Sequence, residues 1–234
     1  MLPLFLFMLA KKWMKRHPER AGALARVLFT RGRLFSFLII SLHFSNAAQA
    51  QQSQLAYSIY RNGKKVGSVH VQRSTDQQSV HYKLESNVKT RFIISFTATA
   101  MEESVFDNGR MVYSSIYRKL NGTEKVNRKT VLNNDQFLVT DYSSTESKNS
   151  FVVALNTLAL YFQEPANVNS VYSDNFQKFL LINPKGQHAY AISLPDGTTN
   201  IYHYRNGICI QIEVQASLYS ATVELDTPQK NSSL

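Results

Sequence analysis

One cysteine and a nearby histidine are the residues of this chain that could form a nucleophile. Cys209 is the only cysteine, and His203 precedes it by six residues. Asn206 and Gly207 stand between them and are typical of a hairpin turn. If Gly207 forms a bulge, His203 lies opposite Cys209, where an imidazole could activate the thiol. If Asn206 and Gly207 form a two-residue turn, His203 pairs with Ile210 instead. We prefer the first register because it keeps aromatic and aliphatic side chains on one face.

A thiol enzyme needs more than this pair. A nucleophile also requires an orienting group and a site for the developing oxyanion, and the sequence shows neither. We therefore interpret Cys209 as a structural residue beside a solvated His203, and predict no catalytic residue. The other histidines after residue 50 (His70, His81 and His188) lack the spacing of zinc motifs, so we predict no metal site and no cofactor. Glu102 and Glu103 are interpreted as a solvated edge.

Aromatic side chains, one carboxylate and one proline gather between residues 160 and 173. Such a loop is typical of the rim of a ligand pocket or of a partner-docking surface. The alternative interpretation is the end of a helix anchored by aromatic residues. The candidate ligand- or partner-binding residues are Tyr161, Phe162, Glu164 and Tyr172, with Tyr202 and Tyr204 from the hairpin that precedes Cys209.

Asn-Gly and Asp-Gly dipeptides divide the chain after residue 50 into β-hairpins. Apolar and polar residues alternate over 208–215, which is typical of an antiparallel sheet with one buried face. The predicted strands span about 55–61, 64–73, 79–90, 92–106, 110–119, 123–132, 136–142, 187–194, 198–205, 208–216 and 218–226.

One segment departs from strand periodicity. Phe151, Leu155, Leu158 and Phe162 recur at helical spacing, with Pro165 beyond the end. They predict one amphipathic helix against the concave face of the sheet, followed by an irregular loop over 164–178 and a turn over 183–186. The expected fold is mainly β: a strongly curved antiparallel sheet or open barrel of about ten strands with one amphipathic helix.

Residues 1–50 read as a targeting region. Arg31 and Arg33 precede an apolar run over 34–44, and Ala48 and Ala50 form the small-x-small pattern of a cleavage site. We therefore predict a signal peptide at about 31–50, with the residues upstream arising from a start site assigned too early. A single β domain over 51–226 and a disordered tail over 227–234 are expected to follow. The apolar run is shorter than the roughly 20 residues of a membrane span, so we expect a periplasmic or secreted protein that is not integral to the membrane after cleavage.

The positive charge of the chain does not indicate a nucleic-acid partner. The formal net charge is +10, but eight of the 26 Lys and Arg residues and one of the 16 acidic residues lie within residues 1–50. A nucleic-acid-binding protein carries its basic patch on the folded part.

Several short segments, taken in order, resemble an uncharacterised family of exported bacterial proteins, one of the domains of unknown function. The segments are 57–67, 85–89, 105–109, 160–165, 171–173 and 195–207. The resemblance implies one exported, β-rich domain and brings no catalytic residues. The general shape is also similar to curved-sheet periplasmic proteins that carry lipids, an analogy of fold alone.

We therefore expect an exported, non-enzymatic protein that binds a hydrophobic or lipid-like ligand in the concavity of the sheet. The alternative is an envelope protein with a filled core that binds another envelope protein. A thiol-dependent or hydrolytic enzyme is the third hypothesis.

Overall fold

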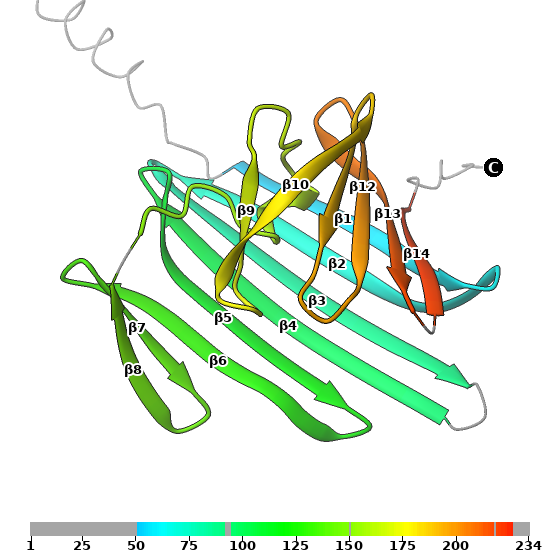
Figure 1. The fold of residues 1–234 in the computed structure, drawn as a ribbon, viewed down its shortest axis with the longest axis horizontal. Coiled ribbons are helices and arrows are strands. Elements are labelled where there is room, and N and C mark those ends of the chain that lie inside the picture. Colours follow the sequence, from blue (N-terminus) through cyan, green and yellow to red (C-terminus); the bar gives the residue numbers. More distant parts are fainter. Residues whose placement is uncertain (1–50, 92–94, 150, 218, 227–234) are drawn as a thin grey trace, which may run out of the picture. The chain divides into compact units, whose positions relative to one another are not determined.

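Fourteen strands of the computed structural model form one antiparallel sheet (Figure 1). The structure describes residues 51–226 apart from 92–94, 150 and 218, so the predicted signal peptide and tail lie outside the described residues. The order in the sheet is β8-β7-β6-β5-β4-β3-β2-β1-β14-β13-β12-β11-β10-β9, with β8 and β9 at its two edges. The strands are β1 (Gln51–Arg61), β2 (Lys64–Asp76), β3 (Ser79–Arg91), β4 (Ser95–Asp107), β5 (Arg110–Leu120), β6 (Thr123–Asn133), β7 (Gln136–Asp141), β8 (Ser144–Asn149), β9 (Ser170–Ser173), β10 (Lys178–Gly186), β11 (Ala189–Ser193), β12 (Thr199–Arg205), β13 (Ile208–Ala216) and β14 (Tyr219–Leu225).

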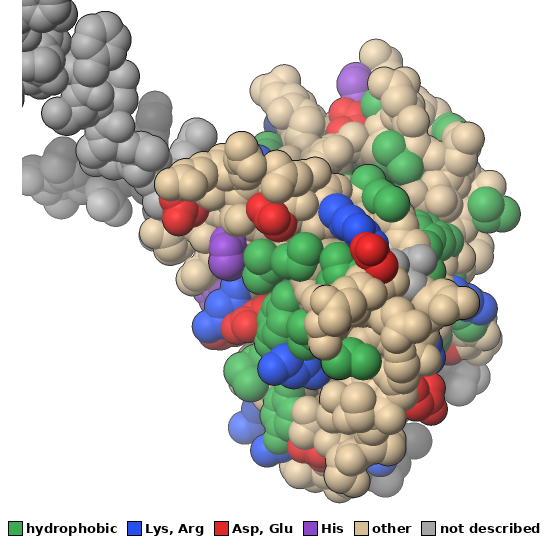
Figure 2. All heavy atoms as spheres, turned by 90° about the vertical axis from the view of Figure 1, so that its left-hand side faces the viewer, with side chains coloured by type: hydrophobic (Ala, Val, Ile, Leu, Met, Phe, Trp, Pro, Cys, Tyr) green, Lys and Arg blue, Asp and Glu red, His purple; other side chains and the backbone are tan. Residues whose placement is uncertain are grey.

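The mainly β, curved antiparallel fold is confirmed, and the hairpin turns account for much of it. Asn62, Asn108, Asn121 and Asn206 each have a positive φ between 48° and 53°, as the Asn-Gly turns require. All eleven predicted strands are present in the sheet. The space-filling view in Figure 2 shows a band of hydrophobic side chains on one side of the sheet, with basic and acidic side chains along its margins.

Three strands were not predicted. β8 is exposed along its whole length and has no apolar alternation, and β9 has only four residues within the predicted loop over 164–178. The predicted turn over 183–186 is wrong, because these residues belong to β10. Pro184 pairs with Tyr190 and lies at a bulge, where its missing N–H is tolerated.

The predicted amphipathic helix is also wrong. Residues 151–162, which we call the inner segment, contain only a single 3-10 turn, Ala159–Tyr161. Backbone carbonyls at the start of this segment, which in a helix would accept hydrogen bonds from within the helix, accept them from neighbouring strands instead. Met111 N donates to Val153 O at 2.9 Å, and Tyr172 N donates to Leu155 O at 3.0 Å. Most apolar side chains of the segment are buried, but by β-strands around it rather than on one helical face.

The inner segment fills part of the concave side of the sheet. Val153 and Leu160 are fully buried there, in one core with side chains from β1–β5, β7 and β9–β14. Side chains also link the two ends of the sheet. Arg128 of β6 donates from Nη1 to the carbonyl of Asn175 at 2.8 Å, and Lys148 of β8 donates to the side-chain oxygen of Gln177. The sheet therefore curls until its ends approach each other through side chains.

Candidate ligand groove

A groove of about 430 Å³ lies on the concave side of the sheet, beside the inner segment. One wall comes from β2–β5 and carries Leu84, Ala100 and the pair Glu102 and Arg118. The other sides come from the inner segment, from the turn between β9 and β10, and from β12–β14. The lining mixes apolar side chains such as Leu158 and Val214 with polar ones such as Asn175 and Asn200, so the groove presents both kinds of surface to a ligand.

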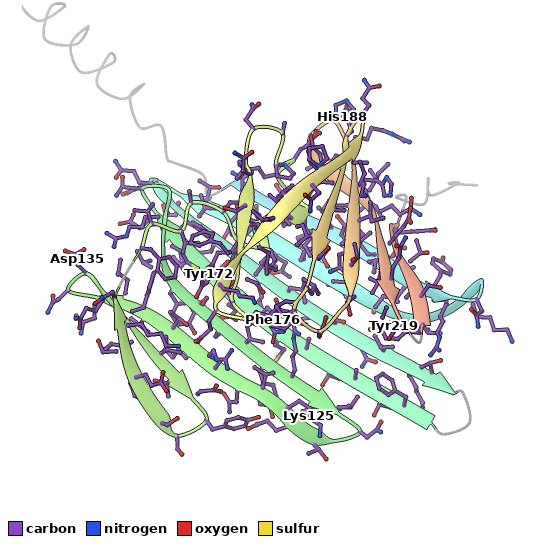
Figure 3. All side chains as sticks on the ribbon, in the orientation of Figure 1. Lys125, Asp135, Tyr172, Phe176, His188 and Tyr219 are labelled. Atoms are coloured by element: carbon purple, nitrogen blue, oxygen red, sulfur yellow. The ribbon has the colours of Figure 1, made fainter. Side chains whose placement is uncertain are left out.

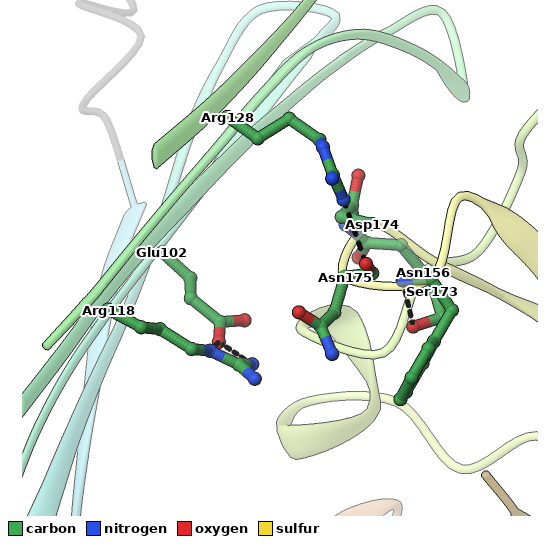
Figure 4. Close-up of polar contacts among 8 residues, drawn as sticks. Glu102, Arg118, Arg128, Asn156, Ser173, Asp174 and Asn175 are labelled. Carbon is green, nitrogen blue, oxygen red and sulfur yellow. Dashed lines mark hydrogen bonds and ion pairs between the residues drawn. The ribbon is translucent and has the colours of Figure 1, made fainter. Parts of the chain in front are cut away.

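An ion pair forms the polar part of the β4–β5 wall. Arg118 donates from Nη2 and Nε to Oε1 of Glu102, and the Nε contact measures 3.2 Å. The Glu102 side chain is only 15% exposed and that of Arg118 is 37% exposed. Figure 4 shows both side chains projecting from the sheet toward the side on which Asn175 lies. The pair is thus held at the boundary between the sheet and the groove.

A second polar cluster holds the turn after β9 to the inner segment. Asn156, which lies beside Asp174 in Figure 4, donates from Nδ2 to Oδ2 of Asp174 at 2.9 Å. Its Oδ1 accepts the backbone N–H of Ala159 at 3.0 Å. Burial raises the pKa of Asp174 to about 6, against the opposing effect of the Ser114 and Asn156 side chains. Asp174 is therefore a buried carboxyl group that gains or loses its proton near neutral pH.

Two of the predicted binding residues, Tyr161 and Tyr202, line the groove. The Tyr161 ring packs edge-on against Tyr57, with ring centroids 5.2 Å apart. Burial raises the phenol pKa of both Tyr161 and Tyr202, so both hydroxyls stay neutral at physiological pH.

The other four predicted residues lie away from the groove lining. Phe162, Tyr172 and Tyr204 are buried in the core, and the Tyr204 hydroxyl donates to the carbonyl of Leu160 at 3.0 Å. Glu164 accepts hydrogen bonds from Tyr190 Oη at 2.8 Å and from His188 Nδ1 at 2.9 Å. It thereby ties the loop after the inner segment to the β10–β11 hairpin.

The expected register of His203 and Cys209 is wrong. Arg205 pairs with Ile208 and Tyr204 with Cys209, after which a bulge shifts His203 opposite Gln211. The bulge turns Cys209 into the core, where it is fully buried and where burial raises its pKa to about 12. His203 instead contacts Glu213 through Nε2 at 2.9 Å. This arrangement does not favour a nucleophilic thiol.

A family model described as a domain of unknown function, DUF6134, matches residues 57–226. The chain belongs to the DUF6134 family. Among solved structures, it is similar to a β-barrel-like protein of the DUF1849 domain of unknown function from Brucella abortus, at 9% identity and a TM-score of 0.46, over 76% of this chain and 96% of that one. No curated protein matches the chain.

Sequence reasoning missed the groove residues of this DUF6134 domain that carry charge. Glu102, interpreted above as part of a solvated edge, faces the concave side together with Ala100 and Phe106, as the alternation of β4 requires. That alternation was the available signal. Its partner Arg118 could be found only from the β4–β5 register, in which Ala100 lies opposite Arg118.

The described residues contain no group of three or more His, Cys, Asp or Glu side chains arranged to hold a metal ion. They also contain no helix of sufficient length and apolar character to cross a membrane.

Proposed function

We propose that this DUF6134 domain binds a small amphiphile in the groove, as a non-enzymatic binding module. The observation that carries the proposal is a groove of about 430 Å³ in which a partly buried ion pair lies beside apolar side chains. That volume falls in the range of ligand pockets, roughly 300–1,000 Å³. Leu84, Leu158 and Val214 would contact the apolar body of the ligand.

The polar groups of the groove favour a head group that donates hydrogen bonds. Glu102 and Asp196 contribute two carboxylates against the single guanidinium of Arg118. Within the described residues, Oε2 of Glu102 has no hydrogen-bond partner, and the buried Oδ1 of Asn200 has none either. An anionic head group would be repelled by the two carboxylates and would bring further acceptors without donors. Hydroxyl or ammonium groups would donate hydrogen bonds to these acceptors.

Native mass spectrometry and organic extraction of the purified protein test the proposal. We expect a co-purified amphiphile at one copy per chain. We also expect calorimetric binding of a monoacylglycerol that is tighter than binding of the fatty acid of equal chain length. A protein that carries no such molecule and binds neither probe would contradict the proposal.

A matched pair of variants on β4 localises the binding. Ala100→Trp fills the groove, because residue 100 lines it, whereas Thr99→Trp places the same side chain on the exposed opposite face of the strand. We expect Ala100→Trp to lose the ligand and Thr99→Trp to keep it, with both variants folded by circular dichroism. Equal binding by the two variants would place the ligand elsewhere.

A further inference from the structure

β8 forms one edge of the sheet, and only β7 lies beside it. All six of its residues, Ser144–Asn149, are exposed, and Figure 1 shows the β7–β8 hairpin at the margin of the sheet. The other edge differs, because Tyr172 of β9 donates to the Leu155 carbonyl and accepts the N–H of Thr157 from the inner segment. Within the described residues, β8 is therefore the edge that remains open to another strand.

The hydrogen bonds of β7 determine which backbone groups of β8 point outward. Tyr142 N donates to Asn127 O at 2.8 Å, so residue 142 bonds toward β6. Successive residues of an antiparallel strand bond to opposite neighbours. Val139 therefore bonds toward β8, where its partner is Glu146. The β8 residues whose backbone groups point away from the sheet are the alternate ones, Thr145, Ser147 and Asn149.

Within the described residues, these outward backbone groups have no hydrogen-bond partner. The hydroxyl groups beside them bond back to β7, Thr145 to Thr140 at 3.0 Å and Ser147 to Gln136 at 2.7 Å. A row of N–H and C=O groups along an exposed edge is a template for pairing with a further strand. Which strand fits best depends on the side chains of β8.

The two charges of β8 complement a second copy of the same strand. Glu146 and Lys148 are its only charged residues, two positions apart and on one face. If two copies pair antiparallel about a two-fold axis at Ser147, the outward groups of Ser147 face each other and those of Thr145 face Asn149. In this register Glu146 of each copy lies opposite Lys148 of the other, as a pair of opposite charge.

Other symmetric registers of two β8 strands are less favourable. An axis at Glu146 brings two glutamates face to face, and an axis at Lys148 brings two lysines face to face. An axis at Thr145 or Asn149 pairs part of β8 with residues that lie outside the strand. The axis at Ser147 is the one that uses all the outward groups and also pairs the charges.

We propose that two copies of this domain associate through β8, antiparallel and in register about Ser147, so that one sheet continues from β7 of one copy into β7 of the other. A strand of another protein could use the same outward groups, but the charges of β8 complement a second β8. A single pair of short strands is smaller than the interfaces of roughly 1,200 Å² or more that stable complexes bury, so dimer and monomer should exchange with protein concentration. No residue of β8 lines the groove, so the contact does not depend on what the groove holds.

Two single-charge variants test the pairing of β8. Glu146→Lys leaves β8 with two basic residues and Lys148→Glu leaves it with two acidic ones, so like charges face each other in each homodimer. By sedimentation velocity we expect concentration-dependent dimers of the natural sequence and self-association about tenfold weaker for each variant alone. An equimolar mixture of the two variants should recover the dimer, because every facing pair between unlike copies then joins opposite charges.

A matched control lies on a central strand. Lys83 and Glu85 of β3 form an ion pair at 2.9 Å with the same spacing of two residues and similar exposure, but β3 has a strand on both sides. Glu85→Lys and Lys83→Glu should each dimerise as the natural sequence does. All variants carry the same residues 1–50, so any self-association of that region is common to them.

Cysteine cross-linking tests the register. Ser147→Cys places two thiols opposite each other, with Cα atoms about 5.5 Å apart, a separation that a disulfide spans. Thr145→Cys places them about four residues apart along the strands, roughly 13 Å. We expect mild oxidation to link copies of Ser147→Cys and not copies of Thr145→Cys, while the buried Cys209 stays unlinked.

Three results would each overturn the proposal. One is a natural sequence that stays monomeric at every concentration it can reach. Another is a mixture of Glu146→Lys and Lys148→Glu that is no more dimeric than either variant alone. The third is equal cross-linking at positions 145 and 147. The Ala100→Trp variant should still dimerise, which separates this proposal from that of the groove.

Discussion

Asn156 and Asp174 are joined by a buried hydrogen bond of 2.9 Å between the inner segment and the turn that follows β9. Asn156 is fully buried, and its side-chain oxygen also starts the 3-10 turn by accepting the N–H of Ala159. One side chain thus fixes the path of the inner segment and the position of the β9–β10 hairpin. Because Asn175 and Phe176 of that hairpin line the groove, this contact also sets one side of the groove.

The buried Asp174 makes stability depend on pH. Burial raises its pKa from 3.8 to about 6, so the folded protein keeps a proton that the unfolded chain has lost. The stabilisation is complete below about pH 4 and is lost as the pH rises through about 6, which amounts to about 3 kcal/mol. Asp174→Asn removes the titration. We expect the difference in unfolding free energy between the two proteins to change by that amount between about pH 4 and pH 8 in urea denaturation.

An exposed aspartate provides the control for this pH dependence. Asp135, in the turn between β6 and β7, is 87% exposed, and Figure 3 shows it at the margin of the sheet. Asp135→Asn, measured over the same pH range, is the matched exposed substitution against which the Asp174→Asn profile is compared. A profile for Asp174→Asn that parallels the natural sequence would show that Asp174 does not hold its proton in the folded state.

The Tyr204 hydroxyl secures the other end of the inner segment. It donates to the carbonyl of Leu160 at 3.0 Å, and Leu160 is fully buried. Tyr204→Phe leaves that carbonyl without its donor and should lower the unfolding free energy by about 1–2 kcal/mol in chemical denaturation. Tyr142→Phe, at a position 53% exposed, should change it by less than about 0.5 kcal/mol. Equal effects of the two substitutions would be inconsistent with this role of Tyr204.

Cys209 should be inert to thiol reagents in the folded protein. Its side chain is fully buried, and burial raises its pKa to about 12, so almost no thiolate exists near neutral pH. We expect alkylation at about pH 8 to proceed only as fast as the protein unfolds, and to become fast in denaturant. Rapid alkylation under native conditions would restore the thiol-enzyme hypothesis.

The hairpins of this fold were predictable because local chemistry determines them. Asn62, Asn108 and Asn121 adopt the positive φ that their turns need, and residue alternation identifies the faces of the strands between them. The inner segment was not predictable from periodicity. Apolar residues at helical spacing meet β-strands on several sides here, and buried extended chain and buried helix place similar demands on residue type.

Which side chains face the groove and the core depends on how neighbouring strands pair. The sequence indicated the wrong pairing for β12 with β13 and no pairing for β4 with β5. Cys209 faces the core because one bulge moves every side chain beyond it to the other face. The pairing of Glu102 with Arg118 likewise requires the β4–β5 register, which contains a shift between Val105 and Phe106. Tyr161 was predicted from the aromatic residues that gather between residues 160 and 173, and Tyr202 from the hairpin before Cys209, but their distance in sequence concealed that they share the groove.

Gly67 offers a test of how closely β2 and β3 approach. Gly67 pairs with Ile59 on one side and Val88 on the other, and an added Cβ would lie 2.3 Å from the carbonyl oxygen of Asn87. The two nearest atoms, the carbonyl oxygen of Asn87 and Cα of Val88, both belong to the backbone, so β2 and β3 would have to move apart. Gly67→Ala should therefore lower the unfolding free energy by about 3 kcal/mol, measured by urea denaturation. Ser68→Ala, one residue along the same strand, should cost less than about 1 kcal/mol. If the two variants unfold at the same urea concentration, β2 and β3 are farther apart at Gly67 than the structure places them.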